Sequence, residues 1–489
     1  MSREIATPRS MNVTPIRKSR SGVSGRGGVG AALAIAALAA GAAIAQDARP
    51  DYRRALAAGY KAAFLCSDLF NGGMTEEMVE RDDLQRTYAE LNPLFDELPA
   101  QIDRANRRVT VRYRDDMPPR LAQWRPHLGC TQLPIGAPVA EAGRLPTLDR
   151  PPLDLADLDA RPWPLGDRDA AGRPTGDRRA LDRTVAAAFD RRTYGQGSES
   201  TAVLVVQNGR IVAERYRPDF TMHTSQRTWS VAKSIAGTIV GAAVQDDILT
   251  LDSPAPVPEW QHPGDPRAAI TTNLLLRMNS GLNSDFAGNR TDALYFGGMG
   301  VGDTLAALPL VAPPGRHFRY SNNDIVAATR GLSHALGEGQ PALAFPFERL
   351  LWRIGMTRTV PETDWRGHFV SSSQMWTTAR DLARLGLLHL ADGMWNGERV
   401  LPAGWTATVR SHAAAQPESG LGYGATWWTF PAASGLPQDA IVAQGNRGQF
   451  LVVIPSRHLV IVRRGFDGGA GAQLDIYAFT RDVLAALRP

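Results

Sequence analysis

A serine and a lysine three positions apart, Ser230 and Lys233, are the residue types that acyl transfer needs. The chain has only three lysines among 54 basic residues, so a lysine here indicates a task that arginine cannot perform. Arginine stays protonated in proteins, whereas a buried lysine can lose its proton and act as a base. On a helix, residues three apart lie on one face. A base held beside a hydroxyl in this way makes an activated serine nucleophile.

The same pair has a structural alternative, in which Thr228 or Ser230 caps a helix and Lys233 is solvated in its first turn. A cation near a helix N-terminus opposes the macrodipole, which disfavours this alternative. Residues 235–244 are apolar on nearly every helical face, and a helix of that kind is usually buried. We therefore expect Lys233 to be buried, with a pKa lowered by desolvation.

A second candidate group, Tyr320-Ser321-Asn322, follows a Pro-Pro-Gly turn and precedes an apolar helix. A cation beside the phenol would lower its pKa, so that the phenolate could take the serine proton. The amide of Asn322 could donate to a substrate carbonyl and contact Lys233. Alone, this tripeptide indicates a helix cap, with Ser321 or Asn322 as the capping residue. In combination with Ser230 and Lys233, it predicts a catalytic set.

Ser230-x-x-Lys233 followed by Tyr320-x-Asn322 resembles the class C beta-lactamase and penicillin-binding-protein superfamily, whose relatives include family VIII carboxylesterases and nylon-oligomer amidases. The resemblance spans about residues 195–489 and leaves the first 190 residues unexplained. Four further stretches resemble the esterase and amidase branch: residues 276–282, 378–384, 422–428 and 445–449. The Ser-x-Asn motif of the class A and peptidase branches also fits residues 321–323, but the adjacent Tyr320 favours Tyr-x-Asn.

The family's third motif is Lys-Thr-Gly on an edge strand beside the serine, and the resemblance places Asn446-Arg447-Gly448 there. Loss of the lysine, which helps to hold a substrate carboxylate in the family, argues against an efficient beta-lactamase or a strict peptidase. Gly448 would let substrate approach the strand closely, and an ordinary turn is the alternative. The backbone N–H groups of Ser230 and Gln449 would form the oxyanion hole. Arg447 is an expected substrate contact.

Aromatic residues near these motifs indicate an apolar acyl pocket, with Trp427 as the expected substrate contact. Aromatic core packing is the alternative for this group, which comprises Trp376, Tyr423, Trp427 and Trp428. The nine histidines show no ligand spacing, and two cysteines are too few for a structural zinc site, so we expect no metal. The resemblance implies a small-molecule ester, amide or beta-lactam-like substrate and no cofactor.

Two predicted hairpins must position these residues. Residues 202–206 and 211–216 flank an Asn-Gly pair that fits a type I′ turn. Residues 450–454 and 459–463 form the second hairpin, and a helix follows over about 474–487. Strands at both ends of a long, mainly helical insert predict an α+β fold, with one antiparallel sheet assembled from both ends of the catalytic region and flanked by helices. This is the beta-lactamase/transpeptidase-like arrangement.

The region before this domain has helical composition at residues 52–69 and 75–91 and alternates like a strand at 107–113. Pro, Gly and Asp dominate the stretch that follows, without periodicity. The predicted organisation has four parts: a signal peptide (1–45), a small helical unit (46–134), a linker (135–185) and the serine hydrolase domain (186–489).

The N-terminus has the three parts of an export signal: a basic stretch, an apolar run over 29–45, and a small-x-small site that ends at Ala45. An uncleaved anchor is the alternative, but the run is short and rich in Ala and Gly for a spanning helix. Cleavage after Ala45 predicts a periplasmic or secreted protein. Beyond residue 45, basic and acidic residues are equal in number, so nothing points to nucleic acid as a partner.

Export makes a disulfide between Cys66 and Cys130 possible. It would close a loop of about 64 residues, worth on the order of 4 kcal/mol. Two buried free thiols are the alternative, since a sequence does not show proximity.

These residues predict an exported serine hydrolase in which Lys233 and Tyr320 deprotonate Ser230 for attack on an ester or amide carbonyl. Tyr320 would then activate the water that releases the acyl-enzyme. One alternative is a weak beta-lactamase or D-amino-acid peptidase, and another is a non-catalytic penicillin-binding-like sensor or envelope protein. The sequence does not indicate an oligomeric state.

Overall fold

The computed structural model describes residues 30–85, 88, 91–284, 291–468 and 473–487. Packing divides the chain into two compact units, residues 1–50 and residues 51–489. The first unit contributes the beginning of helix α1 (Gly30–Phe70). Residues 1–29 of the predicted signal peptide lie outside the described residues, and its cleavage stays a prediction. Over the part of the chain that is described, no helix has both the length and the apolarity to cross a bilayer.

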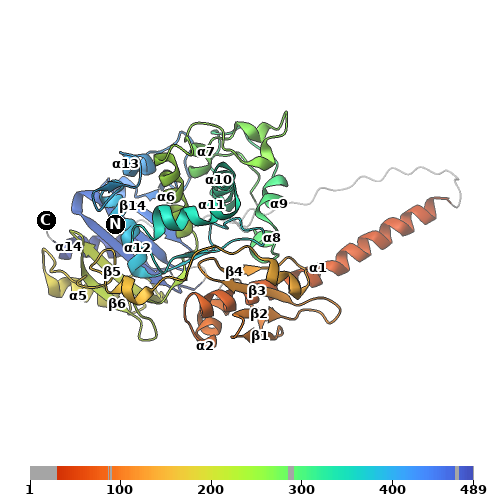
Figure 1. The fold of residues 1–489 in the computed structure, drawn as a ribbon, viewed down its shortest axis with the longest axis horizontal. Coiled ribbons are helices and arrows are strands. Elements are labelled where there is room, and N and C mark those ends of the chain that lie inside the picture. Colours follow the sequence, from red (N-terminus) through yellow and green to blue (C-terminus); the bar gives the residue numbers. More distant parts are fainter. Residues whose placement is uncertain (1–29, 86–87, 89–90, 285–290, 469–472, 488–489) are drawn as a thin grey trace, which may run out of the picture. The chain divides into compact units, whose positions relative to one another are not determined.

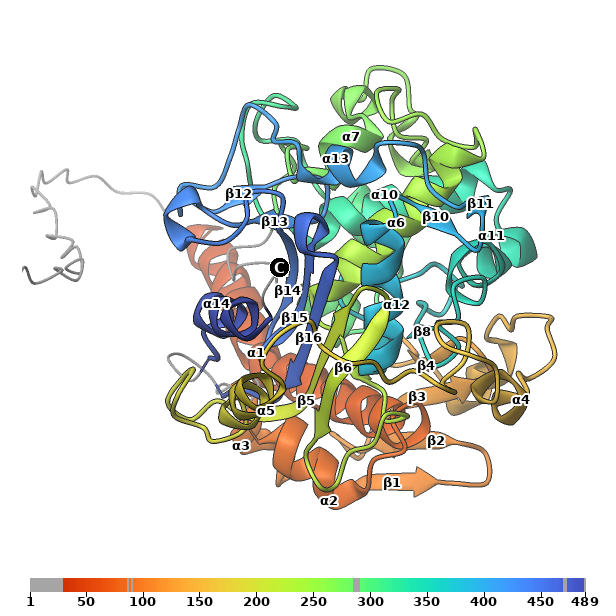
Figure 2. The same ribbon diagram turned by 90° about the vertical axis from the view of Figure 1, so that its left-hand side faces the viewer.

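A seven-stranded antiparallel sheet forms the centre of the second unit (Figures 1 and 2). Its strand order is β12-β13-β14-β15-β16-β5-β6, so β5, from the start of the region, pairs with β16 from its end. The predicted α+β fold is therefore confirmed. The strands are β5 (Ser200–Gln207), β6 (Arg210–Tyr216), β12 (Gly422–Tyr423), β13 (Trp428–Thr429), β14 (Ile441–Gly445), β15 (Gln449–Ile454) and β16 (Leu459–Gly465).

Both predicted hairpins are present in this sheet. Asn208 and Gly209 have φ values of 51° and 77°, as the turn between β5 and β6 requires. Strands β15 and β16 pair from Phe450 with Arg463 to Ile454 with Leu459. The predicted C-terminal helix is α14 (Ile476–Ala486).

Helices cover both faces of the sheet (Figure 2). On one face α14 and α5 (Arg178–Ala187) pack against alternate residues of β5, such as Val203 and Val205. On the other face lie α6 (Val231–Gln245) and α12 (Ala379–Leu390), which join the larger apolar core. The strands are buried on both sides for this reason, and β5 is buried along its whole length.

The insert between β6 and β12 carries the remaining helices and three short strands that form a small sheet in the order β7-β9-β8. These helices are α7 (Thr272–Leu276), α8 (Asp292–Tyr295), α9 (Val301–Ala306), α10 (Asn322–Ala335), α11 (Gly339–Phe345) and α13 (Trp405–Arg410). The strands are β7 (Gln226–Arg227), β8 (Val360–Pro361) and β9 (Met375–Thr377), and a separate hairpin pairs β10 (Met394–Trp395) with β11 (Glu398–Arg399).

The N-terminal region differs from the helical unit that was predicted, because its second half is a four-stranded antiparallel sheet. Only β2 had been expected, because residues 107–113 alternate clearly between polar and apolar side chains, whereas β1 and β3 do not. Thr75 caps α2 as predicted, by accepting a hydrogen bond from Met78 N. The elements are α2 (Glu76–Val79), a π-helical turn (Glu80–Leu84), α3 (Asn92–Phe95), β1 (Ala100–Asp103), β2 (Arg108–Val111), β3 (Arg120–Arg125) and β4 (Gly129–Gln132).

This N-terminal region shares one apolar core with the hydrolase region. The ring of Phe64 on α1 lies 6.0 Å from that of Trp229 and 6.4 Å from that of Trp376. A disulfide between Cys66 and Cys130 joins α1 to β4. Residues 51–134 therefore belong structurally to the hydrolase domain.

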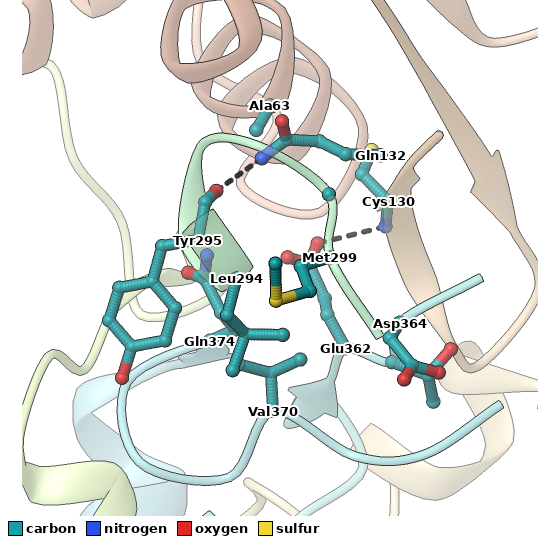
Figure 3. A pocket seen from close by; sticks show the side chains of 12 residues that line it. Ala63, Cys130, Gln132, Leu294, Tyr295, Met299, Glu362, Asp364, Val370 and Gln374 are labelled. Atoms are coloured by element: carbon teal, nitrogen blue, oxygen red, sulfur yellow. Dashed lines mark hydrogen bonds between the residues drawn. The ribbon is translucent and has the colours of Figure 1, made fainter. Parts of the chain in front are cut away.

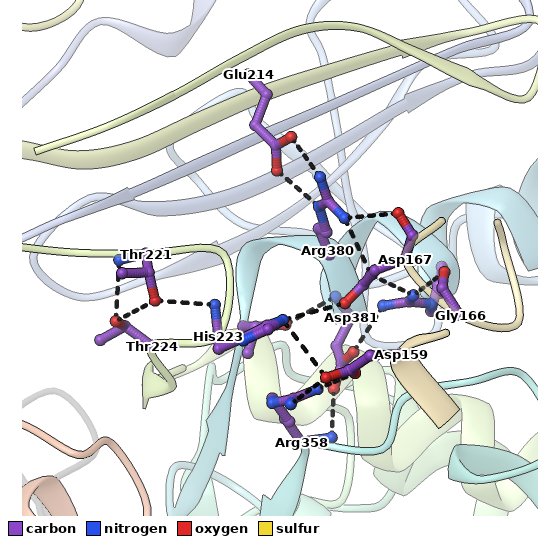
Figure 4. A network of polar contacts seen from close by, with 12 residues as sticks. Asp159, Gly166, Asp167, Glu214, Thr221, His223, Thr224, Arg358, Arg380 and Asp381 are labelled. Atoms are coloured by element: carbon purple, nitrogen blue, oxygen red, sulfur yellow. Dashed lines mark hydrogen bonds and ion pairs between the residues drawn. The ribbon is translucent and has the colours of Figure 1, made fainter. Parts of the chain in front are cut away.

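The predicted linker, residues 135–185, is held to the hydrolase region by partly or fully buried ion pairs (Figure 4). Asp159 lies 2.5 Å from Arg358, and Asp167 lies 2.8 Å from Arg384. His223 Nε2 lies 3.4 Å from Asp167. These carboxylates already face guanidinium groups, so the cluster is an ion-pair network and does not fit a metal site. The linker contains a short 3-10 helix (Val139–Arg144), α4 (Leu155–Asp159) and the start of α5.

Candidate active site

Ser230 and Lys233 meet at the N-terminus of α6, one turn apart. Lys233 is 1% exposed, and its Nζ lies 3.0 Å from Ser230 Oγ and 2.7 Å from Asn322 Oδ1. The third neighbour of Nζ is the carbonyl oxygen of Ser372, at 3.0 Å. The predicted Ser-Lys-Asn group is thus brought together around one nitrogen atom.

Burial lowers the pKa of Lys233 to about 7, and the nearby charge of Arg227 acts in the same direction. As an ammonium, Lys233 donates to all three oxygen neighbours. After loss of one proton, two N–H groups remain for Asn322 and Ser372, and a lone pair can accept the hydrogen of Ser230. The geometry therefore lets Lys233 act as a base toward the serine near neutral pH.

The residue before the serine has a strained backbone. Trp229 has a φ of 50°, in the left-handed region that a bulky side chain rarely adopts. Its ring is held on both sides, by the guanidinium of Arg227 at 4.0 Å and the ring of Phe64 at 6.0 Å. Strain of this kind persists only where the surroundings enforce it, and it occurs often at functional sites.

Tyr320 lies next to this pair, with its ring centroid 5.0 Å from Lys233 Nζ. Burial raises its pKa to about 12, and a hydrogen bond with Ser230 opposes that rise only in part. The predicted lowering of the Tyr320 pKa is therefore wrong, because Lys233 is itself close to neutral and desolvation dominates. Near pH 7 Tyr320 is a phenol that can donate a hydrogen bond.

Both interpretations of the Tyr320-Ser321-Asn322 motif hold, each for a different residue. Ser321 caps α10, because its Oγ accepts from Asn323 N at 3.0 Å and Asp324 N at 3.4 Å. The residues on either side of Ser321 face Ser230 and Lys233. One helix cap therefore positions two candidate catalytic side chains.

The strand beside the serine is β14, whose last residue is Gly445. A Cβ on Gly445 would lie 3.2 Å from Ser230 N and would overlap the carbonyl oxygen of Thr228. Strand β14 pairs with β13 only through Ile441 and Val442, so from residue 443 onward this edge has no strand partner among the described residues. A substrate carbonyl could lie along this edge.

Of the predicted third-motif residues, the structure places Arg447 and Gly448 away from this edge. A Cβ on Gly448 would lie 2.8 Å from Asp467 Cγ, so Gly448 makes room for the Arg463–Asp467 ion pair rather than for substrate. Gln449 begins β15, opposite Gly445, and its side chain bonds Arg464 and Gly465. Its backbone N–H thus lies one strand further into the sheet than the predicted oxyanion hole requires.

Arg447 is also directed away from a substrate. Its side chain is 3% exposed, and Nη1 lies 2.7 Å from Asp83 Oδ1 in the π-helical turn of the N-terminal region. This arrangement therefore disfavours the predicted contact between Arg447 and a substrate, because the guanidinium is engaged in a buried ion pair.

Two of the four aromatic residues expected at the site pack against Tyr320, and the other two belong to the core. Trp427 is fully buried against His389, at 4.7 Å between ring centroids. The adjacent Trp428 instead lies 5.2 Å from Tyr320 and 4.7 Å from Tyr423. Trp376 is buried and donates to Asp68. Trp428 and Tyr423 thus pack against Tyr320, and Trp427 belongs to the core.

A small cavity of about 30 Å³ lies between β4 and α8 (Figure 3). Gln132 donates to the carbonyl oxygen of Tyr295 there, and Cys130 N donates to Glu362. The Tyr295 hydroxyl hydrogen-bonds to the side chain of Ser372. The backbone carbonyl of the same residue accepts a hydrogen bond from Lys233.

Sequence reasoning missed Ser372, Arg227 and Gly445. Ser372 acts through its backbone carbonyl, and any residue type could supply that group, so the sequence does not reveal it. Arg227 lies three residues before Ser230 on another short element, β7. Gly445 is one of two glycines that flank Asn446-Arg447 in the sequence, but the sequence alone does not predict which of the two lies beside α6.

Comparison with known proteins identifies the family and the fold. The Beta-lactamase family model matches residues 181–463. A 6-aminohexanoate-dimer hydrolase of Paenarthrobacter ureafaciens is 24% identical over 286 residues, which cover 54% of this chain and 71% of that protein. EstCE1, described as a hydrolase with promiscuous acyltransferase activity, superposes with a TM-score of 0.50 at 17% identity. The match covers 63% of this chain and 99% of the EstCE1 chain. A class C beta-lactamase has a TM-score of 0.50 at 16% identity, over 63% and 97% of the two chains.

Proposed function

Because the chain belongs to the beta-lactamase family and is a serine hydrolase, we propose that it cleaves an ester or amide bond through an acyl-enzyme on Ser230. The observation that carries this proposal is the contact of Lys233 Nζ with Ser230 Oγ at 3.0 Å, made by a lysine with a pKa of about 7. The named amide and ester hydrolases among its relatives favour these two bond types.

In the acylation step, neutral Lys233 takes the hydroxyl proton as Ser230 Oγ attacks the substrate carbonyl carbon. The carbonyl π electrons move to oxygen, and the oxyanion accepts hydrogen bonds from two backbone N–H groups. One is that of Ser230. For the second we propose Asn446, because it follows Gly445 at the unpaired edge of β14.

Collapse of the tetrahedral intermediate breaks the bond to the leaving group. The leaving oxygen or nitrogen takes a proton from the Tyr320 phenol, which regains it from the Lys233 ammonium. In deacylation a water molecule enters, loses its proton toward Tyr320 and Lys233, and attacks the acyl carbon. Ser230 recovers its proton as the acid leaves, and the enzyme returns to its starting state.

We further propose that the acyl group is neutral and apolar. The ring of Tyr320 packs against Trp428 and Tyr423, and the ring of Phe318 lies 5.5 Å from that of Tyr423, so the surroundings of Tyr320 are aromatic. In the resemblance Asn446 stands at the position of the family's carboxylate-binding lysine, and the neighbouring cation, Arg447, is engaged by Asp83. Substrates with a carboxylate near the scissile bond, such as penicillins, would therefore be poor substrates.

Hydrolysis of p-nitrophenyl acetate and butyrate, with nitrocefin in parallel, tests this function. We expect Ser230→Ala to lose ester turnover. Ser234→Ala is the matched control, because its hydroxyl lies one turn further along α6 and bonds Thr426 O at 2.6 Å. Equal ester turnover in Ser230→Ala would contradict the proposal. A stoichiometric burst without turnover would instead support an acyl-binding sensor.

We also propose that residues 1–45 direct export and that the mature chain begins at Gln46. The basic-apolar-small pattern supports this proposal. The Cys66–Cys130 disulfide supports it too, because disulfides persist in oxidising compartments. N-terminal sequencing of the protein recovered from a periplasmic fraction should begin at Gln46, and an intact Met1 would contradict cleavage.

A further inference from the structure

We propose that Asp83 is a positioning residue for the reaction: through Arg447 it fixes the turn after β14, whose backbone borders Ser230. The inference rests on the proposed function at Ser230. It also assigns a role to the N-terminal region, which lies outside the matched family segment of residues 181–463. The N-terminal region would then contribute to the active site by holding the backbone beside Ser230 in position.

The contact between the two regions is buried and charged. Asp83 Oδ1 lies 2.7 Å from Arg447 Nη1, and the two side chains are 2% and 3% exposed. Buried charge-assisted hydrogen bonds of this kind are directional and resist displacement, because bulk solvent has little access to replace a partner. Asp83 is thus able to hold the end of the Arg447 side chain at a fixed point.

Arg447 also needs such a restraint. It lies in the middle of the three-residue turn Asn446-Arg447-Gly448 between β14 and β15, with a φ of 59°. A non-glycine residue in this left-handed conformation is strained and keeps it only where its surroundings enforce it. The ring of Phe466, 5.1 Å from the guanidinium, and Asp83 supply those surroundings.

The turn is coupled to the serine through Gly445. The position of a Cβ on Gly445 lies only 3.2 Å from Ser230 N, so a small shift of the β14 end changes the space beside the nucleophile. Asn446 N, the second oxyanion donor in the proposed function, belongs to the same turn. Misplacement of such a donor by about 1 Å can cost about 100-fold in rate.

The same π-helical turn offers a matched control. Asp82 is as buried as Asp83 and also pairs with an arginine of the hydrolase region, Arg217, at 2.5 Å. Arg217 follows β6 and does not belong to the β14–β15 turn. Asp82→Asn therefore removes the same kind of charge from the same turn without touching the residues beside Ser230.

The experiment compares kcat, KM and inhibition by phenylboronic acid for full-length wild type, Asp83→Asn and Asp82→Asn, with p-nitrophenyl butyrate as substrate. The boronate forms a tetrahedral adduct with serine and reports on the oxyanion hole. We expect Asp83→Asn to lower kcat by about 10- to 100-fold with a KM within about 3-fold, and to weaken boronate binding in parallel. Asp82→Asn should keep kcat within about 3-fold of wild type.

A double variant, Asp83→Asn with Arg447→Gln, covers the case in which Asp83→Asn does not fold. It leaves no buried uncompensated charge, so it should fold, and it should still lose kcat because the turn is no longer held. Wild-type kcat in either variant, or an equal loss in Asp82→Asn, would overturn the positioning role alone. Wild-type turnover that does not depend on Ser230 would overturn the proposed function as well.

Discussion

The chemistry of Lys233 comes from where it is buried rather than from residue type alone. A lysine on the surface is protonated at neutral pH, whereas here burial and the charge of Arg227 bring its pKa to about 7. The oxygen atoms around Nζ, from Ser230, Asn322 and Ser372, keep either protonation state hydrogen-bonded. Tyr320 differs, because burial keeps its proton in place.

The pH profile of ester hydrolysis should follow Lys233. We expect kcat/KM to rise roughly 10-fold per pH unit below about pH 7 and to level off above it, because the base must be neutral. Ionisation of Tyr320 should not lower kcat/KM below about pH 10, since the pKa of the phenol is about 12. Steady-state rates from pH 5.5 to 9.5 measure this. A profile flat below pH 7 would exclude Lys233 as the base.

Stability should depend on the same titration. The unfolded chain binds a proton at Lys233 up to about pH 10.5, whereas the folded chain loses it near pH 7. The unfolded state therefore binds more protons between these values, so the free energy of unfolding rises with pH in that window. In urea titrations, wild type should gain stability relative to Lys233→Met from about pH 7 to pH 10. An unchanged difference would contradict the lowered pKa.

Tyr320→Phe tests the phenol as a proton donor. The change keeps the ring against Trp428 and Tyr423 but removes the hydroxyl, so folding should be unaffected. We expect kcat for p-nitrophenyl butyrate to fall by about 100-fold, within the usual range for general acid–base groups. An anilide with a poorer leaving group should lose more than the ester. Equal losses on both substrates would contradict protonation of the leaving group by Tyr320.

At the scale of elements, the sequence predicts the helix that holds Ser230 and Lys233 better than the strand beside it. Helical spacing places two residues on one face without further information. On strands, neighbouring residues point to opposite sides, so a one-residue ambiguity between Trp427 and Trp428 reverses which ring faces the site. The third motif was misplaced for a similar reason, since Gly445 and Gly448 flank one turn and only its register decides which faces α6.

Gly445→Ala tests the role of the β14 edge. The added methyl group would overlap Thr228 O and lie 3.2 Å from Ser230 N, so β14 must move away from the nucleophile. We expect kcat/KM to fall by about 100-fold. Gly143→Ala is the control, because nothing lies within 4 Å of its Cβ. A Gly445→Ala enzyme with wild-type kinetics would place the substrate elsewhere.

For the whole molecule, the disulfide is the covalent link within the N-terminal region. Reduction, or the double variant Cys66→Ala with Cys130→Ala, should destabilise the fold by on the order of 4 kcal/mol, because a closed loop of 64 residues is opened. Thermal unfolding with and without reductant measures this. Reductant should have no effect on the double variant, and an unchanged wild-type midpoint would contradict the prediction.

The composition of the whole chain predicted its class but not how its parts join. The hairpins at both ends of the catalytic region, with their Asn-Gly turn and apolar runs, indicated the sheet correctly. The N-terminal sheet and its shared core were not visible, because contacts such as Phe64 with Trp376 depend on tertiary packing that no local pattern encodes.

The pairing of β5 with β16 also bears on how the protein reaches its native state. Ser200–Gln207 is synthesised well before its partner strand, Leu459–Gly465, because the whole insert lies between them. Contacts so distant along the chain require closing a very long loop, which slows folding. The sheet cannot be completed while the ribosome is still translating the insert. We therefore expect folding to be largely post-translational, with the nascent chain dependent on chaperones until its final strand is available.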